Sequence, residues 1–206
     1  MFKLHYERFY SLEAATDRPQ IAKFLKSLRN VKAINLVEIN DSWSLYPSVV
    51  TNLRAIMKIF SSFRSVENCK LTSKNVAIIE NRDLSTLMIS LGSIRALKTF
   101  EFDLVWHSLT TAMFNSFLAG LKQLRSLANL RLKIHGVSLF KEQEFSNISK
   151  VLFGMESLKT LSIKIESTTK MSEDVLWNFG KELAHIKLES INLDLSLKDQ
   201  STFAYI

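Results

Sequence analysis

Apolar and polar residues follow a unit that recurs six times along the chain. Each copy has an apolar residue, two variable residues, a second apolar residue, one variable residue and a third apolar residue. The first residues of successive copies lie 35, 31, 30, 31 and 30 positions apart. Self-similarity at a nearly fixed period is typical of repeat architectures, in which each unit buries its apolar face against its neighbours. The six copies are Val31, Ile34, Leu36; Val66, Cys69, Leu71; Leu97, Phe100, Phe102; Leu127, Leu130, Leu132; Leu158, Leu161, Ile163; and Leu188, Ile191, Leu193.

Each copy predicts a β-strand that follows a helix. In the segment from Leu127 to His135, apolar and polar residues alternate with a period of two, as in a strand with one buried face. The segment before it, from Leu109 to Leu121, has apolar residues at the spacing of one helix face. Similar helical stripes precede the other strands, at residues 21–28, 49–60, 84–91, 145–152 and 175–183.

Capping residues and glycines suggest where these helices begin and end. Ser108 is a candidate N-cap of the helix before Leu127, and Gly120 is a candidate C-terminal stop. Asp83 and Ser172 are further candidate caps. Three other glycines are expected at the same helix-to-strand junction, namely Gly92, Gly154 and Gly180.

Alternating helices and strands predict a parallel sheet, because each return to the sheet passes through a helix. A doubly wound sheet has the same alternation but lacks a shared residue pattern at a fixed period. We therefore expect an α/β fold that is a curved solenoid of about six strand–helix repeats, with the parallel sheet on the concave face and the helices on the convex face. Residues 1–17 would form an N-terminal capping segment with a short strand at Phe2, Leu4 and Tyr6, residues 18–196 the solenoid, and residues 197–206 an apolar C-terminal tail, all within one domain.

The LxxLxL core resembles a leucine-rich repeat protein, and the full helix in each unit is similar to the ribonuclease-inhibitor-like class. The best copies are the segments IRALKTFEF, LRSLANLRL and MESLKTLSI. The chain departs from the family pattern in two ways. Asn or Cys is missing from the position three residues after the last LxL leucine, and the period exceeds the usual length. The resemblance therefore implies a divergent member.

The solenoid interpretation predicts two rows of outward-facing residues across the strands. The central row is Asn35, Lys70, Glu101, Arg131, Ser162 and Asn192, and the next is Val37, Thr72, Asp103, Lys133, Lys164 and Asp194. We expect an acidic pair on the third strand and a basic patch on the fourth and fifth. The candidate partner-binding residues on the concave face are Lys70, Glu101, Asp103, Asn129, Arg131, Lys133, His135, Lys164, Asn192 and Asp194.

These mixed charges favour recognition of a folded protein. The leading hypothesis is a non-catalytic protein–protein interaction scaffold or adaptor, an accessory subunit of a larger assembly, with a hetero-complex preferred to a homo-oligomer. The alternative is an RNA-associated subunit of a ribonucleoprotein, since Lys and Arg total 27 against 20 Asp and Glu, for a net charge of +7. Two further interpretations stay open, a solvated sheet face without a partner and an interface on the helices or loops.

Residues that carry chemistry are sparse and scattered. The five glycines form no phosphate-binding loop, and one cysteine with four separated histidines gives no metal-ligand spacing. Cys69 occupies an inward position, where a buried, unreactive thiol is expected. We therefore predict no enzyme activity, no cofactor and no metal. The lone cysteine and the lack of a long apolar run favour an intracellular, cytoplasmic protein without a membrane span, with the nucleus and organelles left open.

Overall fold

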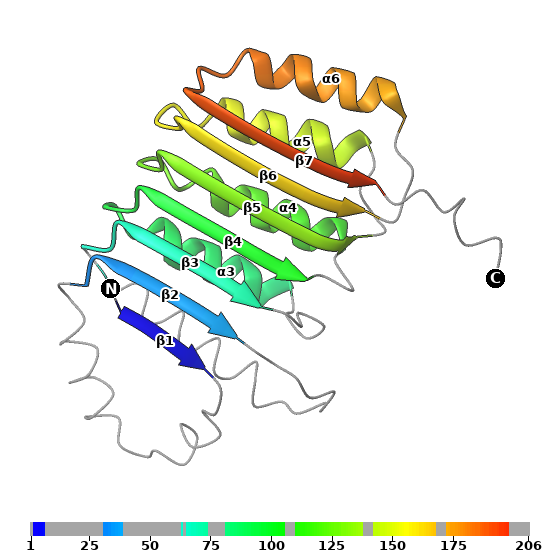
Figure 1. Ribbon diagram of the computed structural model, residues 1–206. Coiled ribbons are helices and arrows are strands. Elements are labelled where there is room, and N and C mark those ends of the chain that lie inside the picture. Colours follow the sequence, from blue (N-terminus) through cyan, green and yellow to red (C-terminus); the bar gives the residue numbers. More distant parts are fainter. Residues whose placement is uncertain are drawn as a thin grey trace, which may run out of the picture.

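The computed structural model describes residues 2–6, 31–38, 63, 65–73, 81–105, 110–137, 142–167 and 172–197. These residues form an α/β fold with one seven-stranded parallel sheet, in which the spatial order of the strands, β1 to β7, is their order in the sequence. The described helices lie together on one face of this sheet (Figure 1). The strands are β1 (Phe2–Tyr6), β2 (Ala33–Glu38), β3 (Asn68–Ser73), β4 (Thr99–Val105), β5 (Asn129–Val137), β6 (Thr160–Ser167) and β7 (Ser190–Leu197), and the helices are α3 (Asn81–Gly92), α4 (Thr111–Leu121), α5 (Glu142–Phe153) and α6 (Glu173–Ala184).

All six strands predicted from the repeated pattern are present, and they pair in parallel as expected. Strand β1 adds a seventh at the N-terminal edge, where Phe2, Leu4 and Tyr6 predicted a short strand. The predicted helices at 21–28 and 49–60 lie outside the described residues, as does most of the predicted N-terminal segment. The predicted C-terminal tail lies outside them too, apart from Leu197, which ends β7.

A recurring backbone hydrogen bond joins each unit to the next just before its strand. The carbonyl of Lys98 accepts from the amides of Ala128 and Asn129, at 2.8 and 2.9 Å. The same double acceptance recurs where β3, β4, β6 and β7 start, so neighbouring units are in register through the backbone as well as through side chains. The other accepting carbonyls belong to Lys32, Glu67, Ala128 and Lys159.

The core lies between the sheet and the helices, and the repeated apolar positions fill it. Phe100, Phe102 and Leu130 are at most 1% exposed, and the Phe102 and Phe117 rings stack with centroids 4.6 Å apart. Each helical stripe at 84–91, 145–152 and 175–183 contributes buried side chains, which confirms the predicted helix faces. The buried members are Leu84, Leu87, Met88, Leu91, Phe145, Ile148, Leu152, Val175, Phe179 and Leu183.

Two of the four glycines predicted at the helix-to-strand junction lie elsewhere. Gly120 and Gly180 lie inside α4 and α6 and not at the helix-to-strand junction. At Gly120, a Cβ atom would lie 2.1 Å from the Cβ of Met88 on α3, so this glycine permits the close approach of two helices. Gly92 ends α3 and Gly154 directly follows α5, as predicted.

The observed helix starts also correct the predicted caps. Helix α4 has Thr110 as its N-cap in place of Ser108, and the Thr110 hydroxyl accepts from the amide of Met113 at 3.2 Å. Helix α3 begins at Asn81, so Asp83 lies within its first turn. Ser172 is the N-cap of α6, as predicted, although its side chain makes no capping hydrogen bond. Caps are hard to place from sequence because several hydroxyl or carboxyl residues often precede one helix.

Candidate functional site

The described helices cover one side of the sheet (Figure 1). The residues of β3 to β7 that alternate with the buried ones point to the other side, and the strand register aligns them in rows. We call this side the polar face. The register places the predicted rows as expected: Lys70 pairs with Glu101, and Glu101 with Arg131. In the second row, Asp103 pairs with Lys133 and Lys133 with Lys164. The rows end on β7 at Asn192 and Asp194.

Two further rows hold the remaining candidates. His135 lies between Val105 and Glu166 towards the ends of the strands. Asn129 lies between Thr99 and Thr160 where the strands begin, and its side-chain amide donates to the Thr99 hydroxyl at 3.2 Å. The structure therefore brings all ten predicted partner-binding residues onto one face.

The central row contains a tight ion pair. The Lys70 ammonium lies 2.7 Å from the Glu101 carboxylate, with both side chains partly buried. The Arg131 guanidinium lies 3.9 Å from the same carboxylate oxygen, and the Arg131 side chain is 53% exposed. Because Glu101 is already engaged by Lys70, Arg131 is the most weakly neutralised cation among the described residues of the polar face.

The second row contains two ion pairs, one between β4 and β5 and one between β6 and β7. Lys133 lies 3.1 Å from Asp103, while Lys164 lies 2.9 Å from Asp194. The two lysines are opposite each other in register, and each turns towards a carboxylate on its other side, which separates the like charges. Glu166 lies 3.3 Å from Lys164 and strengthens the second pair.

His135 connects these two ion pairs. Its Nε2 atom lies 3.4 Å from Asp103, and its Nδ1 atom lies 2.9 Å from Glu166. The hydrogen bond from His135, together with Lys164, holds the pKa of Glu166 below its usual value. The pKa of Lys164 is raised, mainly by its hydrogen bond with Asp194. Ion pairs and hydrogen bonds therefore connect charged side chains from β4 to β7.

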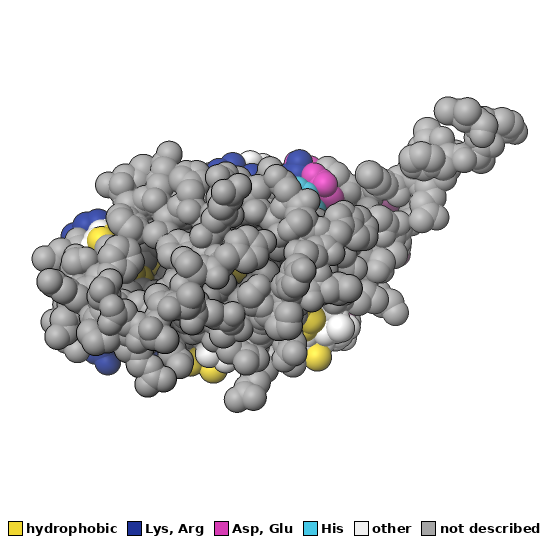
Figure 2. Space-filling view, turned by 90° about the horizontal axis from the view of Figure 1, so that it is seen from below, with side chains coloured by type: hydrophobic (Ala, Val, Ile, Leu, Met, Phe, Trp, Pro, Cys, Tyr) yellow, Lys and Arg dark blue, Asp and Glu magenta, His cyan; other side chains and the backbone are white. Residues whose placement is uncertain are grey.

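The register places the predicted acidic pair on β4 and the predicted basic patch on β5 and β6. Ion pairs join these side chains to opposite charges on neighbouring strands, and Figure 2 shows basic, acidic and histidine side chains next to one another at one edge of the molecule. Among the described residues of these rows, the full charges cancel when His135 is neutral. They are the cations Lys70, Arg131, Lys133 and Lys164 and the carboxylates Glu101, Asp103, Glu166 and Asp194.

A further row of ion pairs lies just before the strands and was missed by the sequence analysis. Glu67 lies 2.7 Å from Lys32 and 3.3 Å from Lys98, and Lys159 lies 2.6 Å from Glu189. Hydrogen bonds, first from Lys32 and then from Lys98, lower the pKa of Glu67. The repeat period does contain this signal, because all five residues occupy the position immediately before a strand.

Residues suited to catalysis or metal binding do not cluster within the part of the chain that the structure describes. No group of three or more His, Cys, Asp or Glu residues there is suited to a metal ion. Cys69 is buried, and burial raises the pKa of its thiol to about 12, so the thiolate that would act as a nucleophile is scarce at neutral pH. None of the described helices is both long and apolar enough to cross a membrane.

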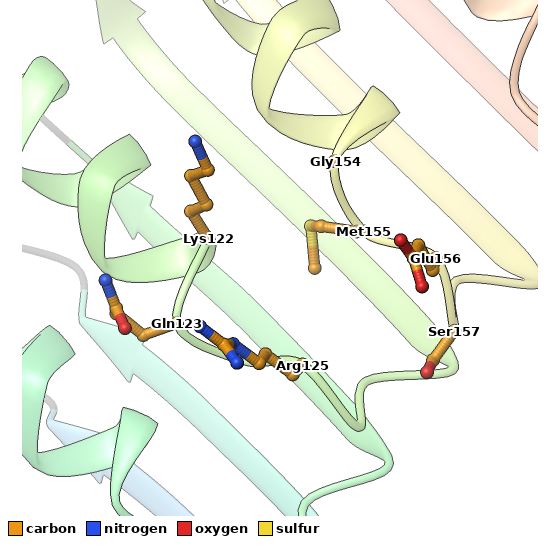
Figure 3. A pocket seen from close by; sticks show the side chains of 7 residues that line it. All are labelled: Lys122, Gln123, Arg125, Gly154, Met155, Glu156 and Ser157. Carbon is orange, nitrogen blue, oxygen red and sulfur yellow. The ribbon is translucent and has the colours of Figure 1, made fainter.

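A hollow of about 360 Å³ lies between the turn after α4 and the turn after α5 (Figure 3). Its lining includes Lys122, Arg125 and Glu156. This hollow was not predicted, and its exposed lining of both charge signs has no buried polar group that would mark it as a ligand pocket. The polar face is therefore the better candidate site.

Comparisons with known proteins identify no family. No protein-family model matches the chain, and no curated protein has a significantly similar sequence.

Proposed function

We propose that this protein is a non-catalytic interaction scaffold or adaptor, built as a solenoid of divergent leucine-rich repeats, whose polar face binds a folded protein in a hetero-complex. The repeat part of the proposal is supported by the sequential strand order and by the double hydrogen bond that recurs at the start of each strand from β3 to β7. In such a solenoid the units contact mainly their neighbours and together present one extended surface.

The observation that carries the proposal is the arrangement of charge on the polar face. Ion pairs between neighbouring strands hold long side chains such as Lys133 and Lys164 in defined positions before any partner arrives. Side chains that are already ordered lose less conformational entropy on binding. A surface with interleaved charges of both signs selects a partner by complementarity rather than by net charge.

The same arrangement favours a protein partner over RNA. An RNA-binding surface neutralises successive phosphates and needs cations that are not already paired. On the polar face, Lys70, Lys133 and Lys164 are each within 3.1 Å of a carboxylate. The net charge of +7 of the whole chain still supports the alternative of an RNA-associated subunit, which the experiment below separates.

We infer a non-catalytic role from the state of the residues that carry chemistry. The thiol of Cys69 is buried with a raised pKa, and both nitrogens of His135 face carboxylates that are themselves engaged by lysines. This environment suits a structural contact, and it leaves no adjacent nucleophile within the described residues for His135 to activate.

The test is a charge reversal at the least neutralised cation. Wild type, Arg131→Glu and a control, Lys150→Glu, would be used to capture binding proteins from native extract. Lys150 is an exposed lysine of α5, on the helical side of the sheet, so both variants change the net charge equally. The affinity of each variant for the purified partner would then be measured. We expect Arg131→Glu to weaken binding about tenfold or more, which corresponds to about 1.4 kcal/mol, and the control to bind as wild type does.

Two outcomes would contradict the proposal. If a folded Arg131→Glu variant binds its partner as tightly as wild type, the interface lies on the helices, loops or ends. If instead the wild type binds generic RNA with an affinity that falls steeply as salt rises, and no protein partner saturates at 1:1, the RNA-associated alternative is favoured.

A further inference from the structure

Strand β7 exposes apolar side chains at positions that are buried in β3 to β6. Ile191 is 47% exposed and Leu193 is 38% exposed. Their register partners on β6, Leu161 and Ile163, are at most 1% exposed. Among the described residues no strand pairs with the outer edge of β7, so this end of the sheet offers free backbone groups beside exposed apolar side chains.

One side of helix α6 also lacks a packing neighbour among the described residues, at Gly180. Gly180 lies three residues before Leu183, the last buried leucine of its helix. The corresponding residues of the earlier helices are at most 3% exposed: they are Met88, Leu118 and Ser149. Met88 faces the next helix at Gly120, whereas a Cβ added at Gly180 would meet nothing within 4 Å. This side of α6 thus has the position of a helix–helix contact but no described helix against it.

The sequence of β7 is complementary to itself. Residues 190–196 read SINLDLS, which is symmetric in character about Leu193. If two copies of the strand run antiparallel with Leu193 opposite Leu193, then Ile191 faces Leu195, and Asn192 faces Asp194. Apolar residues then meet apolar residues, and each Asn192 amide can donate to an Asp194 carboxylate of the other copy, which avoids placing Asp opposite Asp.

We propose that two copies of this protein associate about a two-fold axis through Leu193, with their β7 strands paired antiparallel so that one sheet continues into the other. This geometry is closed and isologous, so association stops at the dimer. It covers Ile191 and Leu193 on both copies and uses the free backbone groups of both edges.

The charges of α6 fit the same two-fold arrangement. Glu173 and Asp174 lie in the first turn of α6 and Lys181 in the last. Because the axis reverses the second helix, the acidic first turn of one copy lies towards the C-terminal end of the other, which is favourable for the helix dipoles. Lys181 at that end stands beside Glu182, so the side chains there add little net charge. A parallel, head-to-tail arrangement lacks this complementarity and would form open chains. The inference does not rest on the proposed function, although Asn192 and Asp194 also belong to the β7 edge of the polar face.

Charge exchange across the axis tests the register. Sedimentation velocity of the full chain over a range of concentrations would give the dimer dissociation constant. In Asn192→Asp, two Asp–Asp contacts replace two Asn–Asp contacts, and we expect the dissociation constant to rise at least about tenfold. The double variant Asn192→Asp with Asp194→Asn exchanges the two side chains and should restore much of the dimer. Ile89→Glu, at a 68% exposed residue of α3, is the control and should leave it unchanged.

Cross-linking gives a second, independent measurement. A cysteine at position 193 would lie opposite its own copy, at the Cβ separation of about 4.5–5.5 Å found for directly opposed residues, and should form a disulfide-linked dimer on mild oxidation. A cysteine at the exposed position 190 would lie about 20 Å from its copy and should not. The native Cys69 is buried and gives a low background.

Three results would overturn the inference. The chain could remain monomeric at all concentrations, which would leave β7 without a second copy. A dimer that Asn192→Asp leaves unchanged, in a variant with the melting temperature of wild type, would place the contact elsewhere. Oligomers that grow beyond the dimer would indicate head-to-tail association. Loss of partner binding by Arg131→Glu would bear on the proposed function alone, because Arg131 is on β5, two strands from the edge.

Discussion

At the residue scale, the two glycines inside α4 and α6 have opposite surroundings. Gly120 is buried, and its missing side chain allows α4 to approach Met88 of α3. Gly180 is exposed on α6, and the space beside it is open. The same residue type therefore has a packing role in one helix and no described contact in the other.

This contrast predicts stability changes of opposite sign. In Gly120→Ala the added Cβ would overlap the backbone and side chain of Met88, and we expect a loss of about 1–3 kcal/mol in the free energy of unfolding. In Gly180→Ala the methyl group enters open space, and the lower backbone entropy of the unfolded chain should add about 0.5–1 kcal/mol. Urea unfolding of both variants, below the concentration at which the chain associates, would measure this. Equal effects at the two positions would contradict the packing argument.

At the element scale, adjacent strands are held together by two kinds of contact. Inward side chains such as Leu132 fill the core, and outward side chains form ion pairs along the register. Exposed ion pairs contribute little to stability, typically below about 1 kcal/mol, whereas a buried leucine contributes several times more. The buried core therefore contributes most of the stability that holds the strands together. The ion pairs of the polar face mainly fix the positions of its side chains.

Equivalent apolar positions on β5 and β7 should contribute differently to the free energy of unfolding. Leu132 is 1% exposed, and we expect Leu132→Ala to lower the free energy of unfolding by about 2–5 kcal/mol. Leu193 occupies the corresponding position but is 38% exposed, and Leu193→Ala should cost about 1 kcal/mol in the monomer. Chemical denaturation at low protein concentration would compare them. A similar cost at both positions would show that another part of the chain covers Leu193 in solution.

The carboxylate of Glu166 predicts a small dependence of stability on pH. The pKa of Glu166 is lowered in the folded protein, first by its hydrogen bond with His135. The ionised carboxylate therefore stabilises the folded protein above the ordinary pKa of 4.5, and this stabilisation is lost as the pH falls through the lower pKa of the folded state. Glu166→Gln should therefore be less stable than wild type at pH 7, by less than about 1 kcal/mol because the side chain is partly exposed, and the difference should shrink at a pH well below 4.5. Urea midpoints at both pH values would test this. Glu156→Gln, an exposed change in the turn after α5, is the control.

At the scale of the whole molecule, the units contact their sequence neighbours and the strands follow one another in order across the sheet. Stability in such an arrangement is close to a sum of unit and interface terms, so the ends open more readily than the middle. Strands β4 to β6 have neighbours on both sides, while β7 has a described neighbour on one side only.

Hydrogen exchange should reveal this gradient. We expect the amides of β5 to exchange most slowly and those of β7 to exchange faster, because β7 can open without disrupting another described strand. Hydrogen exchange at low protein concentration, followed by proteolysis and mass spectrometry of the peptides, would measure the exchange rates of β5 and β7. Added protection confined to β7 at high concentration would support the proposed dimer, and uniform protection of all strands would contradict the gradient.

Much of this architecture follows from the sequence alone. The pattern predicted six strands, and all six are present. It also predicted two rows across the sheet, which the register confirms: Lys70–Glu101–Arg131 and Asp103–Lys133–Lys164. They could be predicted because the side-chain period of a strand is two and the repeat fixes which residues are neighbours, so a short local pattern specifies long-range register.

The tertiary structure decided the features that depend on distances between units. One such feature is the ion pair of Lys133 with Asp103, and another is the contact of Gly120 with Met88. In both cases the two residues are about 30 positions apart in the sequence. The exposure of Ile191 and Leu193 is of the same kind, because they match the apolar pattern of residues that are buried on β3 to β6. A repeated sequence specifies what each unit can bury, but burial itself requires a neighbour, and only the folded arrangement shows which unit lacks one.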